Sequence, residues 1–174
     1  LDTLRQSEPE SALTDLVFTR KRVRPRARQD GLWFIPVRAP RVQLFPLAGL
    51  ITVYRLRQHL RPDVITAQDP LEAGLLSLIL KWIFRVPLEV QIHFNLFSPY
   101  WMKEHRLWNR TRFILARLVL SKADGIRVVS TNLRQPLVDR WGLPERAIDT
   151  IPVPVFWEPL LDANPSEGRD GRPD

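Results

Sequence analysis

The 174-residue chain contains no cysteine and only 7 glycines. It also lacks an apolar run of the roughly 20 residues that a membrane-spanning helix requires. Without cysteine the chain forms no disulfide and uses no thiolate. Such a composition is typical of a reducing compartment, so we predict a cytoplasmic location, at the inner face of the membrane if the protein is peripheral. The three histidines, His59, His93 and His105, are scattered along the chain, which argues against a zinc site.

Charge and composition restrict the class of partner. Hydrophobic residues make up 44% of the chain and charged residues 26%, a balance typical of a globular domain. The formal net charge of +7 favours anionic partners such as phosphates, anionic lipid or nucleic acid. Nucleic acid is disfavoured, because the sequence contains no helix-turn-helix and no aromatic-bearing pair of RNA-binding strands.

Strands and helices are predicted to alternate from residue 64 to residue 155. Three segments lead from apolar or β-branched residues into polar ones, and they cover 62–74, 88–95 and 125–132. Helices are predicted at 47–60, 71–84, 103–121 and 133–141, and a further strand at 148–152. This order predicts βαβ units, and therefore a parallel sheet with right-handed crossovers.

Two predictions concern how individual elements pack. Residues 32–37 form a strand that Pro36 places at the edge of a sheet. Helix 47–60 turns an apolar face inward, formed by Leu47, Leu50, Ile51 and Tyr54, with Val53 as a further candidate.

Polar residues follow each of the first two predicted strands. Gln68 and Asp69 follow the first strand, and His93 and Asn95 follow the second. Because ligands of open parallel sheets bind at the carboxyl ends of the strands, these residues are candidates for a binding site. Asp69 either caps the helix that starts at Pro70 or accepts a hydrogen bond from a hydroxyl of the acceptor. His93 either caps a strand end or donates to a ligand.

The third strand adds three candidates. Ser130 and Thr131 are predicted first as residues at the N-terminus of a helix, and second as groups near a phosphate. Arg127 is a candidate for binding substrate.

Four motifs occur in this order: Pro62-Asp-Val-Ile-Thr-Ala-Gln-Asp, Gln91-Ile-His, Ala123-Asp-Gly-Ile-Arg-Val-Val-Ser and Ile148-Asp-Thr-Ile-Pro. From about Val42 to Phe156 the chain resembles the N-terminal, acceptor-side domain of family-4-like retaining glycosyltransferases of the GT-B fold. The resemblance implies an α/β fold, with a Rossmann-like parallel sheet flanked by helices. It also implies transfer of a sugar from a nucleotide-sugar donor to a hydroxyl acceptor, lipid-linked or part of a polysaccharide, without a cofactor or an essential metal.

The resemblance also assigns roles to the candidate residues. His93 matches a histidine that lines the cleft near the donor sugar, although Phe94-Asn95 departs from the residues that usually follow it. Ser130 and Thr131 are expected near the donor phosphates. The remaining candidates, expected at the substrate, are Gln68, Asp69, Asn95 and Arg127.

The resemblance leads us to expect a partial domain at 1–160 and a linker or disordered tail at 161–174. The first strand of the family's sheet, its glycine-rich loop and its second domain are not found in the sequence. The family's usual Asn-Gly-Val-Asp is replaced by Val153-Pro-Val-Phe. We therefore expect a fragment of a larger transferase that is inactive alone.

The predicted helix 103–121 is amphipathic. Its cations share one face, and they are Lys103, Arg106, Arg110 and Arg117, while Leu107, Ile114, Leu115 and Leu118 share another. The basic face is either an interfacial membrane surface, with Trp101 and Phe113 entering the headgroups, or a solvated face, or a contact for a phosphorylated acceptor. The rival to an enzyme is accordingly a non-catalytic basic module, peripheral to membranes or to an anionic polymer.

Overall fold

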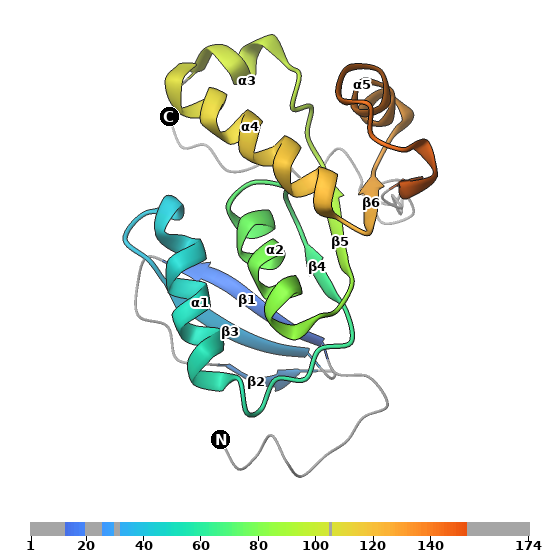
Figure 1. The fold of residues 1–174 in the computed structure, drawn as a ribbon. Coiled ribbons are helices and arrows are strands. Elements are labelled where there is room, and N and C mark those ends of the chain that lie inside the picture. Colours follow the sequence, from blue (N-terminus) through green and yellow to red (C-terminus); the bar gives the residue numbers. More distant parts are fainter. Residues whose placement is uncertain (1–12, 20–25, 30–31, 105, 153–174) are drawn as a thin grey trace, which may run out of the picture.

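The structure, a computed structural model, describes residues 13–19, 26–29, 32–104 and 106–152 (Figure 1). The predicted tail at 161–174 lies outside the described residues. The strands of the described part form two sheets, one of three strands and one of four.

The four-stranded sheet is wholly parallel, as the alternation of strands and helices predicts. Its strands are neighbours in chain order, and they are β4 (Ile65–Ala67), β5 (Leu88–Ile92), β6 (Gly125–Val128) and β7 (Ile148–Thr150). The connections contain α2 (Glu72–Phe84), α3 (Pro99–Glu104), α4 (Arg106–Lys122), α5 (Thr131–Trp141) and the 3-10 helix η3 (Glu145–Ala147). The single helix predicted at 103–121 is thus two helices, α3 and α4.

The three-stranded sheet is mixed. Its order is β1 (Leu13–Thr19), β3 (Leu32–Arg38) and β2 (Arg26–Gln29), with β1 parallel and β2 antiparallel to β3. The prediction of β3 as an edge strand is wrong, because β3 pairs on both sides. Among the described residues the pairs of β3 with β2 reach only as far as Phe34, and Pro36 pairs with Val17 of β1.

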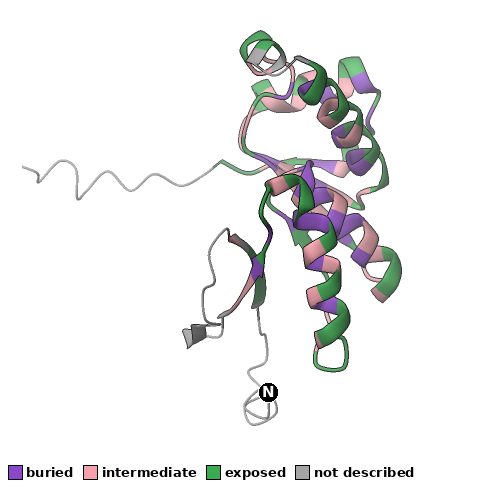
Figure 2. Ribbon diagram, turned by 90° about the vertical axis from the view of Figure 1, so that its left-hand side faces the viewer, coloured by how far each residue is buried: buried purple, intermediate pink, exposed green. Residues whose placement is uncertain are grey.

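One face of the four-stranded sheet carries the main core. Alternate strand residues are buried there under α2, α4 and α5, and they include Leu88, Val90, Ile92, Ile126 and Val128. Figure 2 shows the buried segments gathered where helices meet the sheet. The opposite face carries polar side chains, from Thr66, Glu89, Gln91, Arg127 and Asp149. Parallel sheets usually bury both faces, whereas the apolar residues of this sheet lie on one face only.

A second apolar cluster connects the two sheets through α1 (Phe45–Leu56), which follows the 3-10 helix η2 (Val42–Leu44). The cluster contains Val37, Phe45, Val53, Leu76 and Leu80, from β3, α1 and α2. Figure 1 shows α1 and α2 side by side, with α4 beyond them.

The predicted inward face of α1 is wrong except at Val53, which is buried. Leu47, Ile51 and Tyr54 are exposed, and Leu50 is only partly buried. The helix instead turns Phe45, Gly49 and Val53 inward, because Gly49 has no side chain and Leu76 of α2 fills the space beside it. A pattern of apolar residues does not reveal a contact that a glycine permits.

Gly74 in the first turn of α2 is a further position of close packing. A Cβ atom there would lie 2.8 Å from the carbonyl oxygen of Asp69 and 2.9 Å from Cγ1 of Val119 in α4. The first atom belongs to the backbone, so it cannot move away without shifting the chain at the end of β4. The small residue therefore sets how closely α2 approaches α4 and the Asp69 corner.

We predict that Gly74→Ala lowers the free energy of unfolding by about 1–3 kcal/mol, the usual cost of overpacking a core. Gly125→Ala is the matched control, because a Cβ atom at Gly125 has its nearest neighbour at 3.9 Å. Urea denaturation of both variants measures the effect. Equal stabilities of the two variants would contradict this account of Gly74.

Candidate functional site

The carboxyl ends of β4–β7 meet at one edge of the parallel sheet, here called the strand-end edge. Gln68 follows β4, His93 follows β5 and Ser130 lies two residues beyond β6. The last paired residues of β5 and β6, Ile92 and Val128, are neighbours in the ladder. The loops that carry His93 and Ser130 therefore leave the sheet side by side, as the sequence predicts.

The imidazole of His93 is exposed at this edge and makes no hydrogen bond with any residue that the structure describes. By strand alternation it continues the polar face of the sheet that Glu89 and Gln91 begin. Its donor and acceptor nitrogens are therefore available to a ligand. Gln68 is likewise exposed.

Asp69 forms a turn just before α2, in which its Oδ1 accepts a hydrogen bond of 2.7 Å from the backbone N–H of Leu71. The N-cap residue of α2 is Leu71 and makes no side-chain capping bond, so the prediction that Asp69 caps a helix starting at Pro70 is not confirmed. Burial raises the pKa of Asp69, and the charge of Glu72 adds to the rise, while the Leu71 bond and the charge of Arg112 oppose it.

Glu72 and Arg112 form a largely buried ion pair beside Asp69. Arg112 of α4 donates to Oε2 of Glu72 over 2.8 Å, and Glu72 is only 6% exposed. Glu72 Oε1 and Arg112 Nε are buried without a hydrogen-bond partner. The pair attaches α4 to the N-terminus of α2, where a carboxylate is also favoured by the helix dipole. Sequence analysis missed Arg112, because its partner is 40 residues away and no local pattern connects them.

Asn95 has a structural role in the loop after β5. Its Oδ1 accepts a hydrogen bond of 2.9 Å from the N–H of Phe97, which forms the turn that leads toward α3. The side-chain oxygen is therefore occupied, and the amide nitrogen is the group left for a substrate.

The N-terminus of α5 lies at the same edge. Ser130 occupies the N-cap position in extended conformation, but its hydroxyl makes no capping hydrogen bond. Its carbonyl accepts from the N–H groups of Leu133 and Arg134, and Thr131 is exposed. The predicted N-cap position is confirmed, and the first N–H groups of the helix have no side-chain cap. Such a terminus favours an anion.

Arg127 lies within β6, on the polar face of the sheet. The ladder places it between Gln91 of β5 and Asp149 of β7. Its Nε is buried and has no hydrogen-bond partner. The structure thus places Arg127 one residue before the end of β6 and apart from the loop residues.

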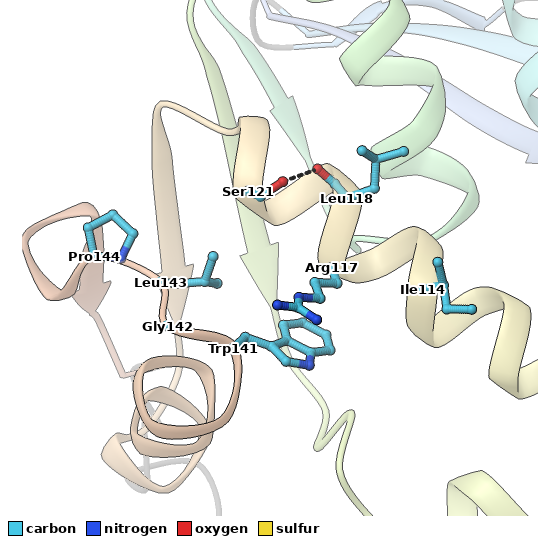
Figure 3. Close-up of a pocket in the computed structure, with 8 residues that line it drawn as sticks. All are labelled: Ile114, Arg117, Leu118, Ser121, Trp141, Gly142, Leu143 and Pro144. Carbon is cyan, nitrogen blue, oxygen red and sulfur yellow. Dashed lines mark hydrogen bonds between the residues drawn. The ribbon is translucent and has the colours of Figure 1, made fainter.

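A pocket of about 560 Å³ lies elsewhere, between α4 and the turn after α5 (Figure 3). Its lining residues are Ile114, Arg117, Leu118, Ser121, Trp141, Gly142, Leu143 and Pro144. The end of α4 leads into the start of β6, and Pro144 precedes β7, so the pocket lies toward the amino ends of these strands. None of the predicted site residues lines it, and the strand-end edge remains the candidate site.

We predict that Arg112→Met lowers the free energy of unfolding by about 3–5 kcal/mol, because it leaves the Glu72 carboxylate buried and unpaired. The double variant Glu72→Met with Arg112→Met should recover most of this loss, since it removes both charges and keeps apolar volume. Chemical denaturation of the three proteins tests this. A double variant as unstable as Arg112→Met would show that the lost charge pairing is not the cause.

We predict a pH effect at Asp69. A raised pKa means that the folded state disfavours the carboxylate, so the contribution of Asp69 to stability falls as pH rises from its ordinary value of 3.8 through the folded pKa. Asp69→Asn keeps the acceptor for the Leu71 N–H but carries no charge. The stability of this variant relative to the parent should therefore increase with pH and then level off.

Thermal unfolding across pH measures this difference. Asp63→Asn is the matched control, because Asp63 is exposed and the net charge changes equally. A relative stability of Asp69→Asn that does not vary with pH would refute the effect of burial.

Comparison with known proteins identifies the family of the chain. A model of the glycosyl transferase 4-like domain matches residues 10–154, which is most of the chain. A search of curated proteins found no match. The match includes both sheets and every candidate residue at the strand-end edge. The chain therefore belongs to the family of glycosyl transferase 4-like domains.

Proposed function

We propose that the chain is the N-terminal, acceptor-binding domain of a retaining glycosyltransferase of the GT-B fold. In this proposal the enzyme transfers a sugar from a nucleotide-sugar donor to a hydroxyl acceptor, and the domain alone is inactive. The carrying observation is the meeting of His93, Gln68 and the α5 N-terminus at one edge of a parallel sheet. Membership of the family gives the reaction class.

Each part of the edge suits one part of the reaction. The bond between the anomeric carbon and the donor phosphate breaks, and a bond to the acceptor oxygen forms on the same face of the sugar. Negative charge builds up on the departing phosphate, and the open N-terminus of α5, at Ser130 and Thr131, provides N–H groups for it. His93 donates a hydrogen bond at the sugar, where charge changes most in the transition state.

The acceptor lies nearer β4 in this scheme. Gln68 is exposed and offers both a donor and an acceptor to sugar hydroxyls, and Asp69 and the amide nitrogen of Asn95 lie on the adjoining loops. Arg127 contacts the substrate from the polar face of the sheet. The formal charge of +7 favours an acceptor that carries phosphate, either lipid-linked or part of an anionic polysaccharide, in the cytoplasm.

A second candidate is a non-catalytic basic module that attaches to a membrane or an anionic polymer. The exposed cations of α4 favour it. A screen for hydrolysis of nucleotide-sugar donors by a full-length enzyme that contains this domain separates the two candidates. Hydrolysis of one donor supports the transferase, and no hydrolysis of any donor favours the module.

We predict that His93→Ala lowers kcat by about 10²-fold or more in that full-length enzyme, as expected for a lost contact in the transition state. The fold should survive, because His93 is exposed and unpaired among the described residues. His59→Ala is the control, since His59 is also exposed but lies in the turn after α1, before the amino end of β4. An unchanged kcat for His93→Ala would remove this residue from the active site.

A further inference from the structure

The outer side of α4 exposes three large apolar residues. Leu107 is 82% exposed, Ile114 70% and Leu118 49%. Their spacing of seven and four residues places them on one side of the helix. Apolar residues at this spacing usually form the face of a helix that packs on the core. In α4 the same face points to solvent instead.

Polar anchors explain the reversal. Asn109 is buried and its amide donates to the carbonyl of Trp101, and Arg112 reaches inward to Glu72. Ala116, Val119 and Leu120 complete the inward side of the helix. Because α4 has apolar residues on both sides, these two anchors decide which side meets the sheet.

The aromatic residues once expected to enter a membrane face the core instead. Phe113 packs edge-on against Phe97 and Trp141, with ring centroids 5.5 and 4.8 Å apart. Trp101 packs near Phe94, at 6.1 Å between centroids. The expectation that Trp101 and Phe113 insert into headgroups is therefore wrong.

Two cations accompany the apolar residues. Arg110 and Arg117 are exposed. Arg110 precedes Ile114 by four residues and Arg117 follows it by three, which places both beside Ile114 on the helix. Neither forms an ion pair with a residue in the described part of the chain. The α4 stripe is defined here as Leu107, Arg110, Ile114, Arg117 and Leu118.

The stripe continues into the pocket of Figure 3. Ile114, Arg117 and Leu118 form one wall, and Trp141, Leu143 and Pro144 form the other. Arg117 and Trp141 both line this pocket. An apolar hollow beside a guanidinium suits a group with a phosphate head and an apolar body.

We propose that the α4 stripe docks on an anionic lipid bilayer, with α4 lying in the plane of the headgroups. Alternating leucine, isoleucine and arginine along a 17-residue helix is the pattern of an interfacial helix, which buries apolar side chains and pairs its cations with lipid phosphates. The two arginines have no acidic partner in the described part of the chain and lie between apolar residues, which matches the phosphates and acyl chains of an anionic leaflet. No helix in the described residues is long and apolar enough to cross the bilayer, so the contact is peripheral.

The exposed face of α1 provides a contrast and a control. Leu47, Ile51 and Tyr54 are also exposed there. Arg57, just after α1, donates to the carbonyl of Tyr54 and stacks on its ring at 3.9 Å, so it is less free for a phosphate. That leaves Arg55 as the exposed cation within α1, against both Arg110 and Arg117 in α4. We therefore assign the docking to α4.

Sedimentation of the 174-residue chain with vesicles tests the proposal. Binding should occur with vesicles of phosphatidylcholine and phosphatidylglycerol, weaken as salt rises, and be at least tenfold weaker with phosphatidylcholine alone. Arg110→Gln with Arg117→Gln should weaken binding about 30-fold at low salt, since each cation near an anionic leaflet contributes about 1 kcal/mol. Leu107, Ile114 and Leu118 changed together to Gln should weaken it at least tenfold.

Matched changes on α1 and just after it separate the effect of the α4 stripe from the effects of net charge and overall surface hydrophobicity. The apolar control changes Leu47, Ile51 and Tyr54 to Gln, and the cationic control changes Arg55 and Arg61 to Gln. Each control alters as many exposed residues as the corresponding variant of the α4 stripe. The apolar triple variant should bind vesicles within about twofold of the parent. The arginine double variant should show only a modest loss of binding, caused by its lower net charge. Equal losses from the α1 and α4 variants would overturn the proposal.

A depth measurement keeps the proposal testable if a variant misfolds. The chain has no cysteine, so Ile114→Cys places a single fluorescent label on the stripe and Leu47→Cys places one on α1. Lipid-borne quenchers should quench the label at position 114 and not the label at position 47. Absence of quenching at position 114 overturns the proposal. A second outcome also overturns it: light scattering shows a dimer for the parent and a monomer for the triple apolar variant of α4, because the stripe would then bind a second copy of the chain.

Discussion

The packing of α2 and α4 against one face of the four-stranded parallel sheet determines where the candidate residues lie. The buried half of β5 and β6 holds the strands parallel, and parallel strands bring their carboxyl ends to one edge. Gly74 allows α2 to approach α4 and the Asp69 corner closely, and the Glu72–Arg112 pair then fixes α4 beside that corner. The loop residues at the edge are exposed because the helices that support them are buried.

The same ion pair connects stability with the outer surface of the molecule. A buried carboxylate and guanidinium are costly to desolvate, and replacing such a pair by apolar residues is often neutral for stability. Glu72 and Arg112 therefore fix the orientation of α4 as much as they contribute to the free energy of folding. Arg112 and Asn109 bond from the side of α4 that carries Ala116, Val119 and Leu120, and Leu107, Ile114 and Leu118 face outward. A helix with apolar residues on both sides needs such anchors to adopt one rotation.

Local patterns were sufficient to predict the alternating strands and helices, and the parallel order of β4–β7 then placed His93, Gln68 and Ser130 at a common edge. Sequence reasoning failed where a distant partner decides the outcome. The inward face of α1 depends on Leu76 filling the space beside Gly49, and that of α4 depends on Arg112 meeting a carboxylate 40 residues away. Side-chain roles were partly predictable. Asp69 accepts from the N–H of Leu71 before α2 instead of capping the helix, and the hydroxyl of Ser130 makes no capping bond, because capping needs a geometry that sequence does not specify.

The strand-end edge and the α4 stripe are connected by the chain itself. The loop after β5 carries His93 and Asn95, and it continues directly through α3 into α4. α4 then runs back toward the amino end of β6, so the stripe begins near the strand-end edge and leads away from it. A bilayer lying along the stripe would therefore pass beside the edge where His93 lies. If the acceptor is anchored in that bilayer, as we propose for a lipid-linked substrate, it would meet the edge at a high effective concentration, because its search would be confined to the membrane surface. Weak contacts from Gln68 and the amide of Asn95 would then be sufficient to orient the acceptor hydroxyl.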